Sequence, residues 1–109
     1  MFFYLKRGVN LYAIDDLLVD TLQTVYEAYL PWGTTPVMTS GCDGAHCENS
    51  LHYKGKAWDF RVFDLKQPQT VADDIRRRLK EKSPHYQVLY GDKNHMDHIH
   101  IEYDENYNG

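Results

Sequence analysis

The chain has 109 residues, of which 42% are hydrophobic and 26% are charged, so it suits one globular domain and leaves no room for a second. Its net charge is −4 and its basic residues are scattered, apart from the arginines at 76–78, which argues against a nucleic-acid partner. No run approaches the roughly 20 apolar residues of a membrane-spanning helix.

The N-terminal residues 1–7 lack the charged-then-apolar order of a secretory signal. We therefore expect a monomeric protein that is made in the cytoplasm. The two cysteines, Cys42 and Cys47, could close a small disulfide, contribute to a metal site or remain free thiols. Two reduced thiols are the first expectation, and a disulfide is the second.

Helix spacing marks residues 14–29, where apolar side chains recur at 14, 18, 22, 25 and 29. Asn10 is the expected N-cap, and the Pro-Trp-Gly sequence at 31–33 ends the helix. This helix is predicted to have a structural role in enclosing the core. A short strand is predicted over 37–39, followed by a polar loop over 40–49 of the kind that often carries function.

Residues 57–62 alternate as a half-buried strand does, which turns Trp58, Phe60 and Val62 towards the core and Asp59 away from it. A second helix is predicted from Pro68 to the stop signal at 83–84, with the arginines at 76–78 on a solvated face.

Residues 86–90 and 98–103 read as two strands of an antiparallel hairpin joined through 91–94. In the second strand, the alternation places His98, His100 and Glu102 on one face. We therefore predict an α+β fold in which helices flank a small antiparallel sheet.

Three polar side chains from two parts of the chain suggest a metal site. His52 and Asp59 lie seven positions apart across a glycine, and His100 belongs to the histidine cluster near the C-terminus. Catalytic zinc keeps three nitrogen or oxygen ligands and a water, and these residues would supply that set. For His85 and His95 we expect only solvated or hydrogen-bonded side chains.

The motif Ser50-x-His52-x-x-Gly55-x-Ala57-x-Asp59, followed by Asp97-x-x-His100, resembles the signature of the zinc D-alanyl-D-alanine peptidases. That family includes carboxypeptidases, dipeptidases and phage L-alanyl-D-glutamate endopeptidase endolysins. Residues 48–59 also resemble the signalling domain of hedgehog proteins, which shares the fold and the zinc site. The resemblance covers roughly residues 37–103 and implies a hedgehog/DD-peptidase-like arrangement.

The resemblance implies that His52, Asp59 and His100 bind zinc and that Asp97 is the general acid/base. His98 matches a histidine that lies near the bound water in related enzymes and can stabilise the oxyanion. His46 matches a histidine that lines the hedgehog site.

Two further residues have expected supporting roles. Ser50 is expected to brace the His52 loop rather than attack substrate, because no serine-activating pair is evident. Many family members carry a substrate-binding arginine after the Thr-Ser-Gly sequence found here at 39–41, but this chain continues with Cys42 and Asp43. Arg61 could replace that arginine or form a surface salt bridge.

We therefore expect a zinc peptidase that acts on peptidoglycan stem peptides. Its size and N-terminus suit a phage lysis enzyme that stays in the cytoplasm until a separately made pore releases it to the cell wall. A D-alanyl-D-alanine dipeptidase or carboxypeptidase is the second enzyme reading. A catalytically silent, hedgehog-like zinc module that binds a partner is the alternative of another class. Calcium binding by the acidic loop around Asp43 and Glu48 stays open.

Overall fold

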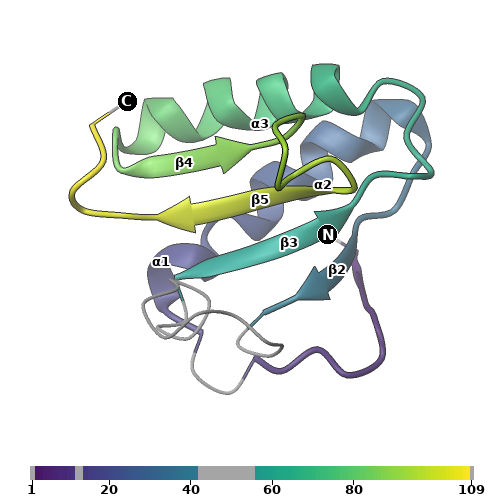
Figure 1. Ribbon diagram of the computed structural model, residues 1–109, viewed down its shortest axis with the longest axis horizontal. Coiled ribbons are helices and arrows are strands. Elements are labelled where there is room, and N and C mark those ends of the chain that lie inside the picture. The colour runs from purple at the N-terminus through teal and green to yellow at the C-terminus, as the bar shows by residue number, and fades with distance from the viewer. Residues whose placement is uncertain (1, 12–13, 42–55, 109) are drawn as a thin grey trace.

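The computed structural model describes residues 2–11, 14–41 and 56–108, in which helices pack against a β-sheet (Figure 1). In chain order the elements are β1 (Tyr4–Leu5), α1 (Asp16–Val19), α2 (Leu22–Tyr29), the 3-10 helix η1 (Leu30–Trp32), β2 (Val37–Ser40), β3 (Ala57–Arg61), α3 (Pro68–Lys82), β4 (Tyr86–Leu89) and β5 (His98–Tyr103). The predicted α+β class is confirmed.

The five strands form one sheet in the order β1-β2-β3-β5-β4. The pairs β2–β3, β3–β5 and β4–β5 are antiparallel, and the last of them confirms the predicted hairpin. The prediction of a purely antiparallel sheet is wrong at one edge, because β1 pairs parallel with β2, with Tyr4 opposite Val37. A strand of two residues is too short to show a period in the sequence.

The single helix predicted over 14–29 is divided into α1 and α2. Asp15, rather than Asn10, is the N-cap, and its carboxylate accepts a backbone N–H of the first turn. At the junction, the Thr21 hydroxyl donates to the Leu18 carbonyl oxygen over 2.7 Å. The backbone N–H of Thr21 donates to the same oxygen over 2.9 Å, so the chain makes an i to i−3 hydrogen bond where α1 ends.

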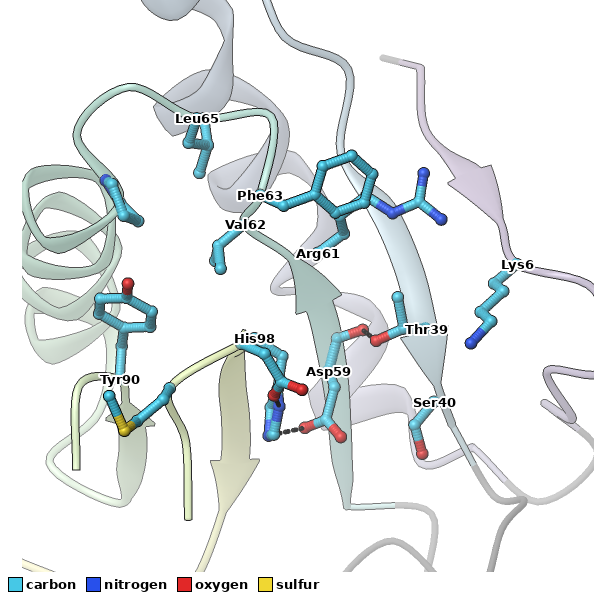
Figure 2. A pocket seen from close by; sticks show the side chains of 13 residues that line it. Lys6, Thr39, Ser40, Asp59, Arg61, Val62, Phe63, Leu65, Tyr90 and His98 are labelled. Carbon is cyan, nitrogen blue, oxygen red and sulfur yellow. Dashed lines mark hydrogen bonds and ion pairs between the residues drawn. The ribbon is translucent and has the colours of Figure 1, made fainter. Parts of the chain in front are cut away.

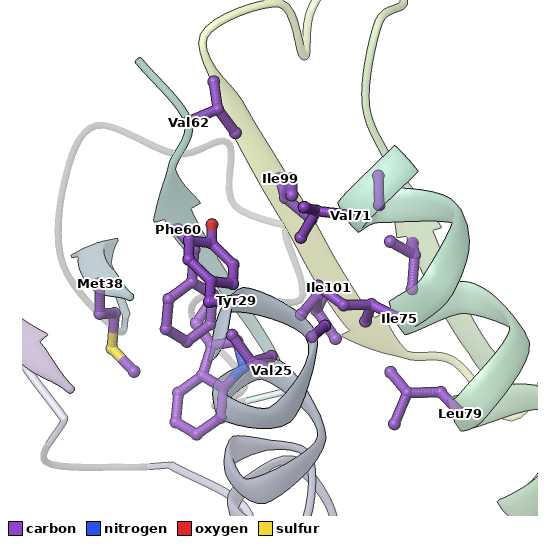
Figure 3. Packing of buried hydrophobic residues seen from close by; sticks show 14 of the residues in the cluster. Val25, Tyr29, Met38, Phe60, Val62, Val71, Ile75, Leu79, Ile99 and Ile101 are labelled. Atoms are coloured by element: carbon purple, nitrogen blue, oxygen red, sulfur yellow. The ribbon is translucent and has the colours of Figure 1, made fainter. Parts of the chain in front are cut away.

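Helices α2 and α3 pack against one face of the sheet and enclose the core (Figure 3). The predicted inward faces are confirmed, because Trp58 and Phe60 of β3 and Ile99 and Ile101 of β5 are almost fully buried. The helices contribute buried side chains that include Val25, Tyr29, Val71, Ile75 and Leu79. Strand β3 is nevertheless buried on both faces, not half-buried as predicted, since Ala57 and Asp59 are also covered.

Helix α3 has the predicted bounds, and its arginines form ion pairs and hydrogen bonds at the surface. Arg77 and Arg78 pair with Asp74 on the same helix. Arg76 also donates from Nε and Nη2 to the carbonyl oxygen of Val88, which ties the helix to β4. None of the described helices is long and apolar enough to span a bilayer.

Candidate metal centre

Pairing of the two central strands brings the described members of the predicted site together. In the register of β3 and β5, Asp59 lies opposite His100 and Arg61 lies opposite His98. The neighbouring residues Phe60 and Ile99 point into the core, so these polar side chains occupy the other face of the sheet. Asp59 and His100 are each only 7% exposed, so the polar pair is largely shielded from water.

Both nitrogens of the His100 imidazole contact carboxylates. Nδ1 lies 2.8 Å from Oδ1 of Asp59, and Nε2 lies 2.6 Å from Oε1 of Glu102. Burial disfavours the imidazolium and lowers the pKa of His100, but hydrogen bonds to the two carboxylates and their charges outweigh it. The net effect raises the pKa of His100 from 6.5 to about 9. Without a metal, His100 is therefore a cation between two anions.

His98 connects this pair to a more exposed carboxylate. Its Nδ1 lies 2.6 Å from Oδ1 of Asp97, and its Nε2 lies 3.8 Å from Oδ1 of Asp59. The Asp97 side chain is 92% exposed, whereas that of His98 is 22% exposed. The hydrogen bond from His98 lowers the pKa of Asp97 below its ordinary value, so this exposed carboxyl is ionised at neutral pH with or without that contact.

A further histidine, His95, adjoins the site. Its ring centroid lies 5.4 Å from that of His98 and 5.1 Å from that of His100. Its Nδ1 contacts Oδ1 of Asp92 over 2.7 Å, so the predicted hydrogen-bonded side chain is confirmed. The prediction missed its place beside the other histidines, although Asp92 and His95 repeat the Asp-x-x-His spacing of Asp97 and His100.

His85 is also hydrogen-bonded as predicted, with its Nδ1 2.9 Å from the carbonyl oxygen of Tyr107. Its ring packs edge-on against Tyr103, and it makes no described contact with the site.

A cleft of about 700 Å³ opens beside Asp59, Asp97 and His98. Figure 2 shows Val62, Leu65 and Tyr90 on one side of it and Lys6, Thr39 and Ser40 on the other. Arg61 also lines the cleft, and its guanidinium carbon lies 4.7 Å from the centroid of the Phe63 ring. Lys6 was not predicted to line a site, because it follows β1, a strand too short to be recognised in the sequence.

No protein-family model matches the chain, and no curated protein matches it.

The described residues suit part of a zinc site. Zinc takes imidazole nitrogen and carboxylate oxygen, which are the atom types that His100 and Asp59 bring to 2.8 Å. A tetrahedral zinc with bonds of about 2.0–2.2 Å holds two ligand atoms roughly 3.3–3.5 Å apart, so this pair needs to open by only about half an ångström. Within residues 2–11, 14–41 and 56–108, no group of three His, Cys, Asp or Glu side chains could hold a metal.

The predicted third ligand, His52, lies outside the described residues, as do Ser50, His46, Cys42 and Cys47. The acidic loop around residues 43 and 48 lies outside them too. Their roles stay predictions.

Proposed function

We propose that this protein is a zinc-dependent peptidase that hydrolyses an amide bond in peptidoglycan stem peptides, at an L-alanyl-D-glutamate or a D-alanyl-D-alanine link. The observation that carries the proposal is the direct pairing of Asp59 with His100, with Asp97 and His98 beside them at the edge of a cleft. An ion-binding pair beside a carboxylate and a second imidazole contains the groups that amide hydrolysis needs.

In this proposal His52, Asp59 and His100 hold the zinc. When bound, zinc supplies Lewis-acid polarisation of the substrate carbonyl and makes water a better nucleophile at neutral pH. The hydrogen-bonded carboxylate of Asp59 and the buried imidazole of His100 are already aligned, so little side-chain entropy is lost when they bind.

Asp97 and His98 are proposed to supply proton transfer and oxyanion stabilisation, respectively. Asp97 is exposed and ionised, so it can accept the proton of the attacking water and return it to the leaving amine. Because the hydrogen bond to the Asp97 carboxylate uses His98 Nδ1, the other nitrogen, Nε2, faces Asp59. From there Nε2 of His98 is placed to donate a hydrogen bond to the oxyanion of the tetrahedral intermediate.

The cleft suits an acidic peptide. Arg61 and Lys6 line it, and neither forms an ion pair with any residue that the structure describes. They can pair with a substrate carboxylate, while Val62, Leu65 and Tyr90 cover apolar parts of the peptide. We also propose the phage-type role, in which the enzyme waits in the cytoplasm for release to the wall; this rests on the family resemblance alone.

Substitution of Asp97 tests whether the site is catalytic. Asp97→Asn keeps the size of the side chain but cannot accept a proton from water, so turnover of purified muropeptides should fall by roughly 10²- to 10⁴-fold. Zinc content, measured by elemental analysis, should stay near one per chain. The same change at Asp73, on the outer surface of α3, serves as the control and should leave both values unchanged.

Near-normal hydrolysis by zinc-loaded Asp97→Asn would remove this residue from the mechanism. Loss of zinc together with activity would make Asp97 a ligand instead. A wild-type protein that binds zinc but cleaves no muropeptide would favour the silent, hedgehog-like binding module.

A further inference from the structure

We propose that Glu102 positions His100 for metal binding, by holding the Nε2–H of its imidazole and leaving Nδ1 as the nitrogen that binds the ion. The inference rests on the proposed zinc site and adds a residue to it. It also assigns a different role to each nitrogen of one ring.

The contacts of His100 distinguish its two nitrogens. Asp59 approaches Nδ1 from the neighbouring strand β3. Glu102 approaches Nε2 from β5, the strand of His100 itself, two residues further along the chain. Because the two nitrogens of an imidazole point away from each other, the carboxylates lie on different sides of the ring. One ion therefore cannot replace both hydrogen bonds.

The cleft shows which side is available to a metal and substrate. Asp59 lines the cleft together with His98, whose Nε2 lies 3.8 Å from the same Asp59 oxygen that contacts His100. Neither His100 nor Glu102 is among the described residues that line this cleft, so Asp59 is the partner that connects the His100 ring to it. The Nδ1 side of His100 thus faces the groups proposed for catalysis, and the Nε2 side faces away from them.

Glu102 is built into the sheet in a way that suits a fixed support. Its strand is an inner one, with Ala57 opposite Glu102 on β3 and Gln87 opposite it on β4. The Glu102 side chain is 15% exposed and lies 2.6 Å from His100 Nε2. A carboxylate that accepts the free N–H of a metal-binding histidine fixes the ring and makes its other nitrogen a stronger ligand.

The test is the zinc affinity of Glu102 variants, measured by competition with a metal-sensitive dye. Glu102→Gln keeps an oxygen that can accept from Nε2–H but lacks the charge, so its affinity should fall roughly 10-fold. Glu102→Leu offers no acceptor and should approach a 100-fold loss, the upper end for such substitutions. Glu105→Gln, the same change at an exposed position near the C-terminus, should bind zinc like the wild type.

A second measurement separates positioning from a loss of folding. In zinc-loaded wild-type protein with isotope-labelled histidine, NMR should show His100 Nε2 protonated and Nδ1 bound to metal. In Glu102→Leu, circular dichroism should match the wild type while the Nε2 proton exchanges faster with water.

The outcomes separate this inference from the proposed function. Wild-type affinity in both Glu102 variants, or zinc on Nε2 of His100, would overturn the positioning role and leave the peptidase proposal intact. A wild-type protein that binds no zinc would overturn both. Zinc affinity needs no turnover, so the graded loss would support the role of Glu102 even if no muropeptide were cleaved.

Discussion

At the scale of single residues, the most informative group is the buried imidazole of His100. Two carboxylates hold it, and each contact is short enough for a charge-assisted hydrogen bond. A buried imidazolium of this kind is stable only while its carboxylate partners remain ionised, and the buried carboxylates in turn depend on the imidazolium. Zinc would replace one of these contacts with a stronger one.

This arrangement predicts how the stability of the metal-free protein depends on pH. The pKa of His100 is about 9 in the folded protein and close to 6.5 in the unfolded chain. Since the folded value is higher, its contribution is fully present below pH 6.5 and is lost as pH rises through about 9. The melting temperature in a chelating buffer should therefore fall across this window.

Among the residues that the structure describes, the titratable groups that contact His100 are Asp59 on β3, Glu102 on β5 and His95 in the preceding loop, while His98 contacts Asp59. His100→Gln removes the titrating group and should give a flatter curve from a lower starting melting temperature. A wild-type melting temperature that is constant or rises between pH 6.5 and 9 would contradict the buried imidazolium.

At the scale of elements, one buried hydrogen bond joins α2 to the strand that carries Asp59. The Tyr29 hydroxyl donates to the carbonyl oxygen of Arg61 over 2.8 Å, and the Tyr29 side chain is fully buried. Arg61 ends β3 directly opposite His98. The contact therefore anchors the end of the strand beside the candidate site.

Tyr29→Phe should leave that carbonyl without its partner and lower the free energy of unfolding by about 1–3 kcal/mol. Tyr86→Phe is the matched control, because its hydroxyl also donates to a carbonyl, that of Leu17, but at an exposed position where water can substitute. Urea denaturation of both variants compares the two costs. A loss for Tyr29→Phe no larger than that for Tyr86→Phe would show that the anchor is dispensable.

Elements with long, regular periods could be predicted from the sequence. The apolar positions 71, 75 and 79 mark α3 because each returns to the same face of a helix, and all three are fully buried. The alternation in β5 likewise identified the face shared by His98 and His100. In both cases local spacing alone determines where the side chains point.

Features that depend on contacts between distant segments could not be predicted. At the break between α1 and α2 both the N–H and the hydroxyl of Thr21 bind the Leu18 carbonyl oxygen, an arrangement that leaves the apolar spacing unchanged. The position of His95 against His98 and His100 depends on the turn held by Asp92. The parallel pairing of β1 depends on where β2 lies in the fold, and the two residues of β1 carry no information about that position.

At the scale of the whole molecule, one face of the sheet forms the hydrophobic core and the other carries the candidate site. Helices α2 and α3 cover the face that carries Trp58 and Ile101, and this packed layer makes the opposite face rigid (Figures 1 and 3). The polar face then presents Asp59 and His100 from two adjacent strands. Sites built on strands are held more accurately than sites built on loops.

Net charge also bears on the substrate. The protein carries a formal charge of −4, yet Lys6 and Arg61 both line the cleft. Asp59 and Asp97 line the same cleft, so the positive charge of Lys6 and Arg61 acts only on the part of the cleft that these two side chains border. The free carboxylates of the proposed stem-peptide substrate would pair with these two cations.

The central claim is that the protein uses zinc to hydrolyse stem peptides, and mass spectrometry of purified muropeptides tests it most directly. One sample receives zinc-loaded protein, a second receives protein stripped with a chelator, and a third receives stripped protein with zinc restored. We expect the first and third to yield two fragments whose masses sum to the substrate plus one water, which also identifies the bond. Intact muropeptides with zinc-loaded protein, or equal cleavage by the stripped protein, would contradict the claim.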